Sequence, residues 1–226
     1  MKINKKKLSI LFIGRKNDAY CKKAIKFIKK HFQVYRILVG KRGDPFPSKI
    51  SLWKGDYIIS YLSPWIIKAS LLKRAKIASI NFHPGPPEYP GIGCTNFAIY
   101  NREKVFGVAC HHMNRKVDTG KIIAVKRFPL NKSDVVYSLT QKCYKHILSL
   151  FYDIMDIVIN GRKLPEIKEN WTRKPYKRFE LNELCRITTD MNEKEIKRRV
   201  KSVSFANKSG AYIKIAGMKF KYSDED

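Results

Sequence analysis

Residues 76–93 read KIASINFHPGPPEYPGIG, and the rest of the chain is interpreted outward from them. The first eight residues form an apolar run that ends in polar side chains, which predicts a buried strand. Residues 83–93 then hold four prolines and three glycines in eleven positions. No helix or strand survives that composition, so a stiff loop is predicted. A buried strand that runs into such a loop is typical of the ligand-binding edge of an α/β sheet.

The residues before this stretch alternate short apolar runs with helical patterns. The predicted elements are strands at residues 8–14, 34–40 and 56–62, a helix from Asn17 or Asp18 to about Phe32, a loop over 41–51, and a helix from Pro64 through residue 75. This alternation predicts an α/β fold, with a Rossmann-like, mostly parallel sheet that carries helices on both faces.

The residues after it first continue this pattern and then change. The predicted elements are a short helix over residues 95–101, strands at 104–113 and 121–130, a long helix from Ser133 or Asp134 to about Asn160, a short helix near 192–200, and a hairpin around Gly217. Gly161 is expected to stop the long helix. The chain is therefore divided into a main domain, residues 1–161, and a small C-terminal α+β extension with a hairpin, residues 162–226.

The charge of the chain is far from balanced. Lys and Arg number 47 against 19 acidic residues, a formal net charge of +28. Such an excess favours contact with nucleic acid, an anionic membrane or phosphorylated small molecules. The lysines are spread along nearly every predicted element, however, and a diffuse basic coat that serves only solubility explains them equally well. The 44% of hydrophobic residues supply a core and argue against wholesale disorder.

The cysteines and the apolar runs bear on the compartment. The five cysteines are odd in number, far apart and without a C-x-x-C pair, so neither a disulfide framework nor a zinc site is expected. Reduced thiols fit a cytoplasmic protein. The apolar run at residues 8–14 ends in Arg15 without a cleavage site, and no run approaches the roughly 20 apolar residues of a membrane span. His111 and His112 are adjacent, so on a strand they face opposite sides and cannot chelate one metal together.

Three polar residues are candidates for chemistry. Asn81 and His83 lie two apart on a strand and therefore face the same side. Asp118 lies on a loop between two later strands and is placed to reach the same edge. An asparagine amide and a protonated histidine suit the oxyanion of an acyl transfer to an amine, and a carboxylate beside the histidine orients it and relays protons. From the residues alone, structural roles are the commoner explanation: a hydrogen-bonded strand-end histidine and two turn formers.

Residues 60–130 resemble the folate-dependent formyltransferase family. The resemblance rests on SINFHPGPPEYPGIGCTNFAIYN (residues 79–101) and VFGVACHHMNRKVDTGKII (residues 105–123). The family signature is a strand ending N-x-H-P, a Pro/Gly-rich loop, a helix, two strands and D-x-G before the second strand. The resemblance implies a catalytic trio, with Asn81 on the oxyanion, His83 on the oxyanion and the proton, and Asp118 as tuning and relay group.

The resemblance also implies the ligands. The formyl donor would be N10-formyltetrahydrofolate, without a metal, its pterin held mainly by the backbone of two segments: Ser60, Tyr61 and Leu62, and Arg115, Lys116 and Val117. The sequence HPGPPEYPG and the segments 176–184 and 209–222 are most similar to the sugar N-formyltransferases, whose acceptor is a nucleotide-linked amino sugar. Our specific expectation is dTDP-4-amino-4,6-dideoxyglucose. The residues expected to contact it are Arg15 at the diphosphate and Pro84, Gly85 and Tyr89 along the sugar. A homodimer through the C-terminal part is the family-like expectation.

Two alternatives stay open on the sequence. A methionyl-tRNA formyltransferase would use the same chemistry, and the net charge favours it because phosphate contacts dominate RNA affinity. Only 65 residues follow Gly161, which is short for a separate tRNA-binding domain. A non-catalytic RNA-binding protein on the same scaffold would need no intact trio. Trp171, Tyr176 and Phe179 would either stack on a nucleobase or pack in the core.

Overall fold

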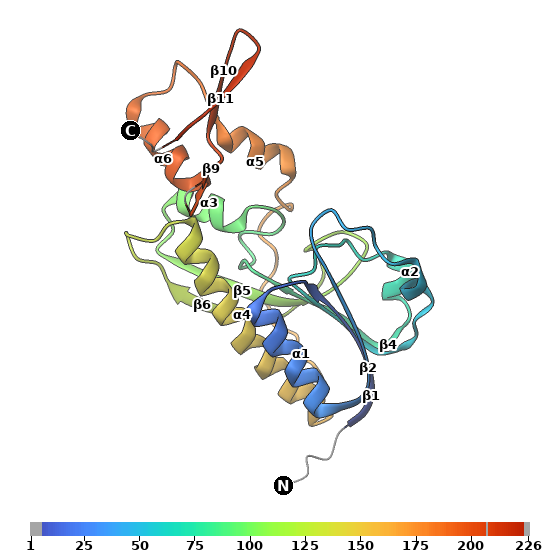
Figure 1. The fold of residues 1–226 in the computed structure, drawn as a ribbon. Coiled ribbons are helices and arrows are strands. Elements are labelled where there is room, and N and C mark those ends of the chain that lie inside the picture. The colour runs from blue at the N-terminus through green and yellow to red at the C-terminus, as the bar shows by residue number, and fades with distance from the viewer. Residues whose placement is uncertain (1–5, 207, 224–226) are drawn as a thin grey trace.

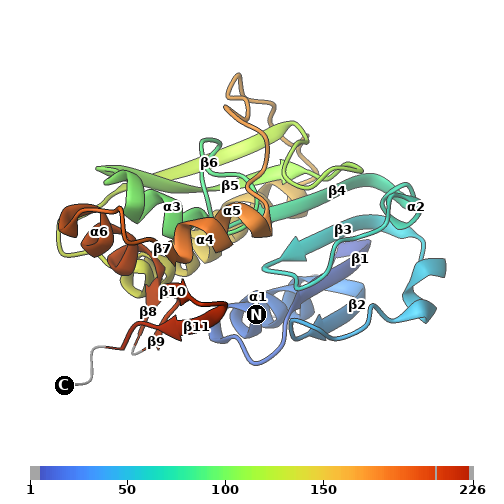
Figure 2. The same ribbon diagram turned by 90° about the horizontal axis from the view of Figure 1, so that it is seen from above.

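The computed structural model describes residues 6–206 and 208–223. A six-stranded sheet in the order β2-β1-β3-β4-β5-β6 forms its centre (Figures 1 and 2). Its strands are β1 (Lys6–Arg15), β2 (Phe32–Gly40), β3 (Gly55–Tyr61), β4 (Ala75–His83), β5 (Val105–His112) and β6 (Ile122–Pro129). The pairs from β2 through β4 are parallel, and β5 is antiparallel to both of its neighbours. The predicted Rossmann-like, mostly parallel α/β sheet is confirmed.

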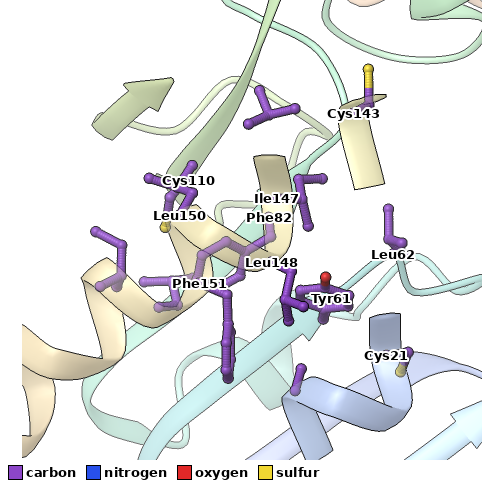
Figure 3. Close-up of a cluster of buried hydrophobic side chains, with 14 of the residues drawn as sticks. Cys21, Tyr61, Leu62, Phe82, Cys110, Cys143, Ile147, Leu148, Leu150 and Phe151 are labelled. Atoms are coloured by element: carbon purple, nitrogen blue, oxygen red, sulfur yellow. The ribbon is translucent and has the colours of Figure 1, made fainter. Parts of the chain in front are cut away.

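One face of the sheet carries the two long helices, α1 (Ala19–His31) and α4 (Val136–Ile159), side by side (Figure 1). Helix α1 begins where predicted because the Asp18 side chain accepts a hydrogen bond from the Cys21 N–H at 2.7 Å. Figure 3 shows the core between sheet and α4, where Tyr61 and Phe82 from the strands meet Ile147, Leu148 and Phe151. Burial of this apolar surface fixes the position of the strand ends that carry the candidate site.

Two short elements cover the other face. A 3-10 helix, η1 (Ser48–Leu52), lies where a loop was expected, and a four-residue helix, α2 (Ala69–Leu72), replaces the longer helix expected from Pro64. The early start was wrong because Trp65 is held in a turn. Its N–H donates to Ser63 Oγ at 3.1 Å, and its indole N–H donates to the Asp44 carbonyl at 2.7 Å. These contacts outweigh the helix preference of the intervening residues.

The C-terminal part packs on α3 (Cys94–Asn101), the short helix predicted after the Pro/Gly loop. Its elements are α5 (Arg178–Cys185), β7 (Arg186–Ile187), α6 (Glu193–Val203), β8 (Ser204–Phe205), β9 (Lys208–Ser209), β10 (Tyr212–Ile215) and β11 (Met218–Lys221). Helix α6 and the β10–β11 hairpin were predicted, whereas α5 was not. Helix α5 is only eight residues long, too short for its apolar spacing to mark a helix in the sequence. The division of the chain at residue 161 stays a prediction.

Across the described ranges, 6–206 and 208–223, no helix is long and apolar enough to cross a membrane.

Candidate active site

The carboxyl ends of the central strands bring the polar residues together. Strand β4 places Asn81 and His83 two residues apart, and its neighbours align Ser60 of β3 and His111 of β5 with Asn81. Three polar side chains therefore stand side by side across three strands at this edge. The loop after β5 then brings Asp118 onto the same edge, as expected from the sequence.

Asp118 is the centre of the hydrogen-bond network. Its Oδ2 lies 3.2 Å from His83 Nδ1 and accepts the Gly91 N–H at 2.8 Å. Its Oδ1 lies 3.2 Å from His111 Nε2 and 3.5 Å from Asn81 Nδ2. The residue is buried, and its backbone adopts φ +45°, a left-handed conformation that costs an aspartate on the order of 1 kcal/mol. The network holds the carboxylate there despite this cost.

The surroundings keep Asp118 ionised. Burial by itself raises the pKa of this carboxyl, but the His83 charge, the His111 hydrogen bond and charge, and the Gly91 N–H together lower it from 3.8 to about 2. Both ring nitrogens of His83 face acceptors, Nδ1 the carboxylate and Nε2 the Tyr89 carbonyl at 2.9 Å. Only the doubly protonated ring donates to both of them. The His83 ring is therefore held between the Asp118 carboxylate and the Tyr89 carbonyl at the edge of the sheet.

His111 is a member of this network that the sequence reasoning missed. Its Nδ1 contacts the His112 carbonyl at 2.8 Å, so Nδ1 carries a proton. Its Nε2 lies 3.1 Å from Asn81 Nδ2 and 3.2 Å from Asp118 Oδ1. When neutral, Nε2 accepts from Asn81; when protonated, it donates to Asp118 instead. Asn81 Nδ2 therefore has two possible acceptors, His111 Nε2 and Asp118 Oδ1. In the sequence, His111 could have been found only as a polar residue on the strand that pairs with the strand of Asn81.

The segment after α4 closes one side of the network. The Trp171 ring meets His83 and His111 edge-on, at centroid distances of 5.9 and 5.0 Å, and its indole N–H donates to the Gly120 carbonyl at 2.8 Å. The backbone of Tyr176 pairs with the Pro/Gly loop: its N–H donates to the Pro90 carbonyl at 2.9 Å and its carbonyl accepts the Ile92 N–H at 3.0 Å. The C-terminal extension therefore supplies part of the wall around the trio.

A cavity of about 960 Å³ opens at this edge of the sheet. Its volume is typical of small-molecule sites. The sequence-predicted residues that line it are Asn81, His83, Asp118, Ser60, Leu62, Arg115, Lys116, Val117, Arg15 and Pro84. Around Leu62 the wall is apolar, with Pro64, Ile67, Leu72 and Met113. Leu62 has φ +51°, so the backbone turns sharply where β3 meets the cavity.

Three predicted contact residues do not line the cavity, although the contact expected of Tyr61 is through its backbone. The Tyr61 side chain packs in the core against Phe12, Phe82 and Phe151, which leaves only its backbone near the edge. Gly85 fills a tight space, because an added Cβ would lie 2.8 Å from both His83 Nε2 and the Tyr89 carbonyl. Tyr89 is buried and its hydroxyl donates to Glu103 at 2.5 Å, so its ring does not form the expected wall along a sugar. A proline-rich loop predicts stiffness but not which side chain turns inward.

The three aromatic residues of the C-terminal extension differ in their contacts and exposure. Trp171 contacts the histidines, and Tyr176 stacks on Phe97 at 3.7 Å within the core. Phe179 is 62% exposed. Cys94 is buried and its thiol donates to the Pro84 carbonyl, and burial raises its pKa to about 12, which argues against a nucleophile.

Six basic residues gather at one end of the cavity. They come from the end of β1, the end of β2 and the start of α5: Arg15, Lys16, Lys41, Arg42, Lys177 and Arg178. The Lys16 N–H donates to the Gly40 carbonyl, which ties the first two pairs together. Burial, and then the Arg42 charge, lower the pKa of Arg178. Within the described part of the chain none of the six forms an ion pair, so this end of the cavity is suited to an anion.

Known proteins resemble the stretch that carries the trio. The formyl transferase family model matches residues 41–152. The bifunctional polymyxin resistance protein ArnA of Wigglesworthia glossinidia brevipalpis is 34% identical over 97 residues, 42% of this chain and 15% of that protein. GDP-perosamine N-formyltransferase of Brucella melitensis biotype 1 is 35% identical over 85 residues, 37% and 33% of the two chains. Methionyl-tRNA formyltransferase of Enterococcus faecalis is 26% identical over 136 residues, 59% and 44%. The matches thus cover less than half of each relative.

Solved structures share the fold over nearly the whole chain. A 4-N formyltransferase from Francisella tularensis superposes with a TM-score of 0.76 at 19% identity and covers 96% of this chain and 98% of that one. An N-formyltransferase from Helicobacter canadensis, in complex with folinic acid and dTDP-3-aminofucose, gives a TM-score of 0.69 at 19% identity and covers 94% and 86%. The family match spans the strand that holds Asn81 and His83 and the loop that holds Asp118, so residues 41–152 of the chain form a domain of the formyl transferase family.

Proposed function

We propose that this protein transfers a formyl group from N10-formyltetrahydrofolate to the amino group of a nucleotide-linked amino sugar. The observation that carries the proposal is the position of the trio, which lines one cavity between an apolar wall and a cluster of six cations. An amine held between these two ends would meet Asn81 and His83. The family of the chain supplies the reaction class, and the cavity supplies the argument for the substrates.

The apolar end fits the donor. Leu62, Ile67, Leu72 and Met113 offer flat apolar surface, and the sharp turn at Leu62 exposes backbone groups to a planar ring. In small-molecule sites, backbone N–H and C=O groups form hydrogen bonds with the polar edge of a ring. We therefore assign the donor site to the backbone of Ser60 to Leu62 and to the loop with Arg115, Lys116 and Val117. Bound there, N10-formyltetrahydrofolate would supply the formyl carbon. The Helicobacter canadensis enzyme was crystallised with folinic acid, a related folate.

The residues of the chain divide the chemistry. Asn81 and a protonated His83 would stabilise the negative charge that develops on the formyl oxygen when an amine attacks. The contact between His83 Nδ1 and the Asp118 carboxylate would keep the ring oriented toward the reacting groups. The ionised Asp118 would take up the amine proton through His83 or directly, and the proton would then pass to N10 of the folate as the bond from N10 to the formyl carbon breaks. His111 would exchange its hydrogen bond between Asn81 and Asp118 as this proton moves.

The basic end fits the acceptor. A diphosphate would occupy the cations from Arg15 to Arg178, and the sugar amine would then point toward the trio. Sugar-modifying relatives support this acceptor class, since one match is named GDP-perosamine N-formyltransferase and one solved neighbour was crystallised with dTDP-3-aminofucose. Our specific expectation remains dTDP-4-amino-4,6-dideoxyglucose. We also expect the protein to act in the cytoplasm, because all five of its cysteines are free thiols.

We further propose a homodimer through the β10–β11 hairpin. Ile215, Met218 and Phe220 are all about half exposed there, and the outer strand β11 has an open edge. An exposed apolar edge of this kind is normally covered in solution. Sedimentation analysis should give twice the mass of one chain, and replacing Met218 and Phe220 with Lys should return it to one chain.

A methionyl-tRNA formyltransferase is the second candidate. The net charge of +28 and the match to the Enterococcus faecalis enzyme favour it. The six cations gather around one cavity, which suits a compact phosphorylated acceptor better than a tRNA. A non-catalytic RNA-binding protein would have no use for a buried, ionised carboxylate between two histidines.

The test is an acceptor panel. The full chain is incubated with N10-formyltetrahydrofolate and either nucleotide-linked 3-amino sugars, nucleotide-linked 4-amino sugars or methionyl-tRNA, and formylated products are identified by mass spectrometry. We expect a gain of one formyl group on an amino sugar, with the 4-amino-4,6-dideoxyglucose compound reacting fastest. Formylation of methionyl-tRNA alone would replace the proposed acceptor, and no turnover with any acceptor would refute the proposed reaction.

A further inference from the structure

A second cavity, of about 800 Å³, lies away from the trio, between α3, the loop before α4, and α6. Its floor contains the apolar side chains of Ala98, Ile99 and Leu130. Its remaining lining is almost entirely charged or amide: Arg102, Glu103, Lys104, Asn131, Lys132, Asp134, Glu193, Lys194, Lys197, Arg198 and Lys201. The described residues thus place seven cations and three carboxylates around one hollow, and the formyl-transfer chemistry uses none of them.

Hydrogen bonds fix the three walls relative to one another. Lys201 Nζ donates to the Lys132 carbonyl at 3.1 Å, which joins α6 to the loop before α4. The Arg198 guanidinium donates to the Tyr100 carbonyl at 2.8 Å, which joins α6 to the end of α3. The Leu130 N–H donates to the Lys104 carbonyl at 2.8 Å. The hollow is therefore a built feature of the fold rather than a gap between mobile segments.

The carboxylates of this cavity are already engaged. Asp134 is buried and accepts from Lys142 Nζ at 2.6 Å and from the Asn131 N–H at 2.8 Å. Glu103 accepts the Tyr89 hydroxyl, and Glu193 pairs with Lys197. Lysines thus neutralise Asp134 and Glu193, whereas Glu103, whose partner is a neutral hydroxyl, keeps its negative charge in the cavity.

Most of the cations have no acidic partner. Lys197 pairs with Glu193, and Arg198 pairs with Glu195 at 3.7 Å. Five others form no ion pair with any residue that the structure describes: Arg102, Lys104, Lys132, Lys194 and Lys201. Along α6, Lys194, Lys197 and Lys201 follow one another at helical spacing, so their side chains share one face. Five unpaired cations around one concavity create a strongly positive potential there.

Arg102 adds an argument from the backbone. It ends α3 with φ +57°, a left-handed conformation that glycine adopts at lower energy. A residue other than glycine costs about 1 kcal/mol or more at such a position. Here that residue brings a guanidinium to the rim of the hollow.

We propose that this second cavity binds the polyphosphate group of a small molecule such as a nucleoside triphosphate. Several unpaired cations suit several phosphate oxygens, and the apolar floor at Ile99 and Leu130 accepts an attached organic group. The volume is that of a small-ligand site. An RNA strand would instead call for cations along an extended open face. The proposal does not depend on the formyl-transfer reaction.

Site-resolved nuclear magnetic resonance of the full chain tests it. Inorganic tripolyphosphate, and separately ATP, are added at about 0.1 M salt, and backbone amide shifts are followed. We expect saturable shifts around residues 102–104, 131–132 and 194–201, whether or not amides near the first cavity also shift. The double variant Lys194→Gln/Lys201→Gln should raise the dissociation constant measured at residues 131–132 at least about tenfold, because it removes two charge-assisted contacts.

The matched control is Lys22→Gln/Lys29→Gln on α1. It removes the same charge at the same spacing from exposed positions outside both cavities. It should change that dissociation constant less than about twofold. Equal weakening by both variants would mean diffuse charge attraction and would overturn the proposal, as would the absence of shifts at residues 131–132 in the wild-type protein. Tighter binding of a twelve-nucleotide single-stranded RNA than of ATP at these amides would replace it with a nucleic-acid site.

Discussion

Asp118 determines the behaviour of the site at the scale of single residues. Its carboxylate contacts two histidine rings, an asparagine amide and a backbone N–H, and its backbone adopts a left-handed conformation. The carboxylate is the one group that touches every other member of the trio. Its charge therefore acts on both Asn81 and His83 through direct contacts.

Replacing Asp118 with Asn should reveal this charge in the stability of the protein. The folded pKa of about 2 lies below the ordinary 3.8, so the stabilisation is complete above about pH 4 and is lost as the pH falls toward 2. The wild type should lose about 2 kcal/mol more of its unfolding free energy than Asp118→Asn across that interval. Urea unfolding at several pH values measures this difference. A wild-type advantage that is equal at pH 5 and pH 2 would contradict the assigned charge.

The sequence predicted the trio but not its surroundings. Asn81 and His83 follow from the two-residue period of a strand, and Asp118 follows from the family signature. His111 depends on the register between β4 and β5, and Trp171 depends on how a segment fifty residues later folds back. Both positions depend on contacts between segments that are far apart in the sequence. The inward or outward direction of Tyr89 in the Pro/Gly loop is set by its partner Glu103, which no local pattern reveals.

At the scale of elements, the Pro/Gly loop and the segment around Tyr176 act as one unit. Gly91 joins them: its N–H donates to Asp118, and its backbone forms an isolated bridge with Tyr176. Regular elements with strong periods, such as β1, α1 and α4, were predictable from sequence. The helix expected from Pro64 was overridden by the packing of Trp65, and α5 was missed because it spans only eight residues.

Replacing Gly91 with Ala should disrupt this unit. The residue has φ +88°, and an added Cβ would lie 2.4 Å from the Tyr176 carbonyl oxygen. We expect a loss of about 2–4 kcal/mol in unfolding free energy, together with reduced formyl transfer. Gly161→Ala is the matched control, because its φ of +66° imposes backbone strain without a contact. That variant should lose only about 1–2 kcal/mol. Equal losses would show that the Tyr176 contact is unimportant.

At the scale of the whole molecule, part of the net charge of +28 gathers in two places, the six cations that line the first cavity and the cations around the second cavity. The remaining lysines are consistent with a solvated coat. Composition alone could not separate these cases, because it carries no information on which cations lack acidic partners in the folded chain.

The acceptor should respond to salt through this charge. Raising the NaCl concentration from about 50 to 500 mM should increase the KM for the nucleotide-linked sugar roughly threefold or more, because screening weakens the attraction of a diphosphate to Arg15, Arg42 and Arg178. The kcat should change little, since His83 and Asp118 are buried. Steady-state kinetics at several salt concentrations measure both. A KM that is independent of salt would remove the diphosphate from this end of the cavity.

The central claim is that Asn81, His83 and Asp118 carry out formyl transfer in this cavity. The most direct measurement is the rate of formyl transfer by His83→Ala, at saturating donor and acceptor, with circular dichroism to show that the variant is folded. We predict a fall of about three orders of magnitude or more, because the change removes both oxyanion stabilisation and proton transfer. A folded variant whose rate stays within about tenfold of the wild type would contradict the account.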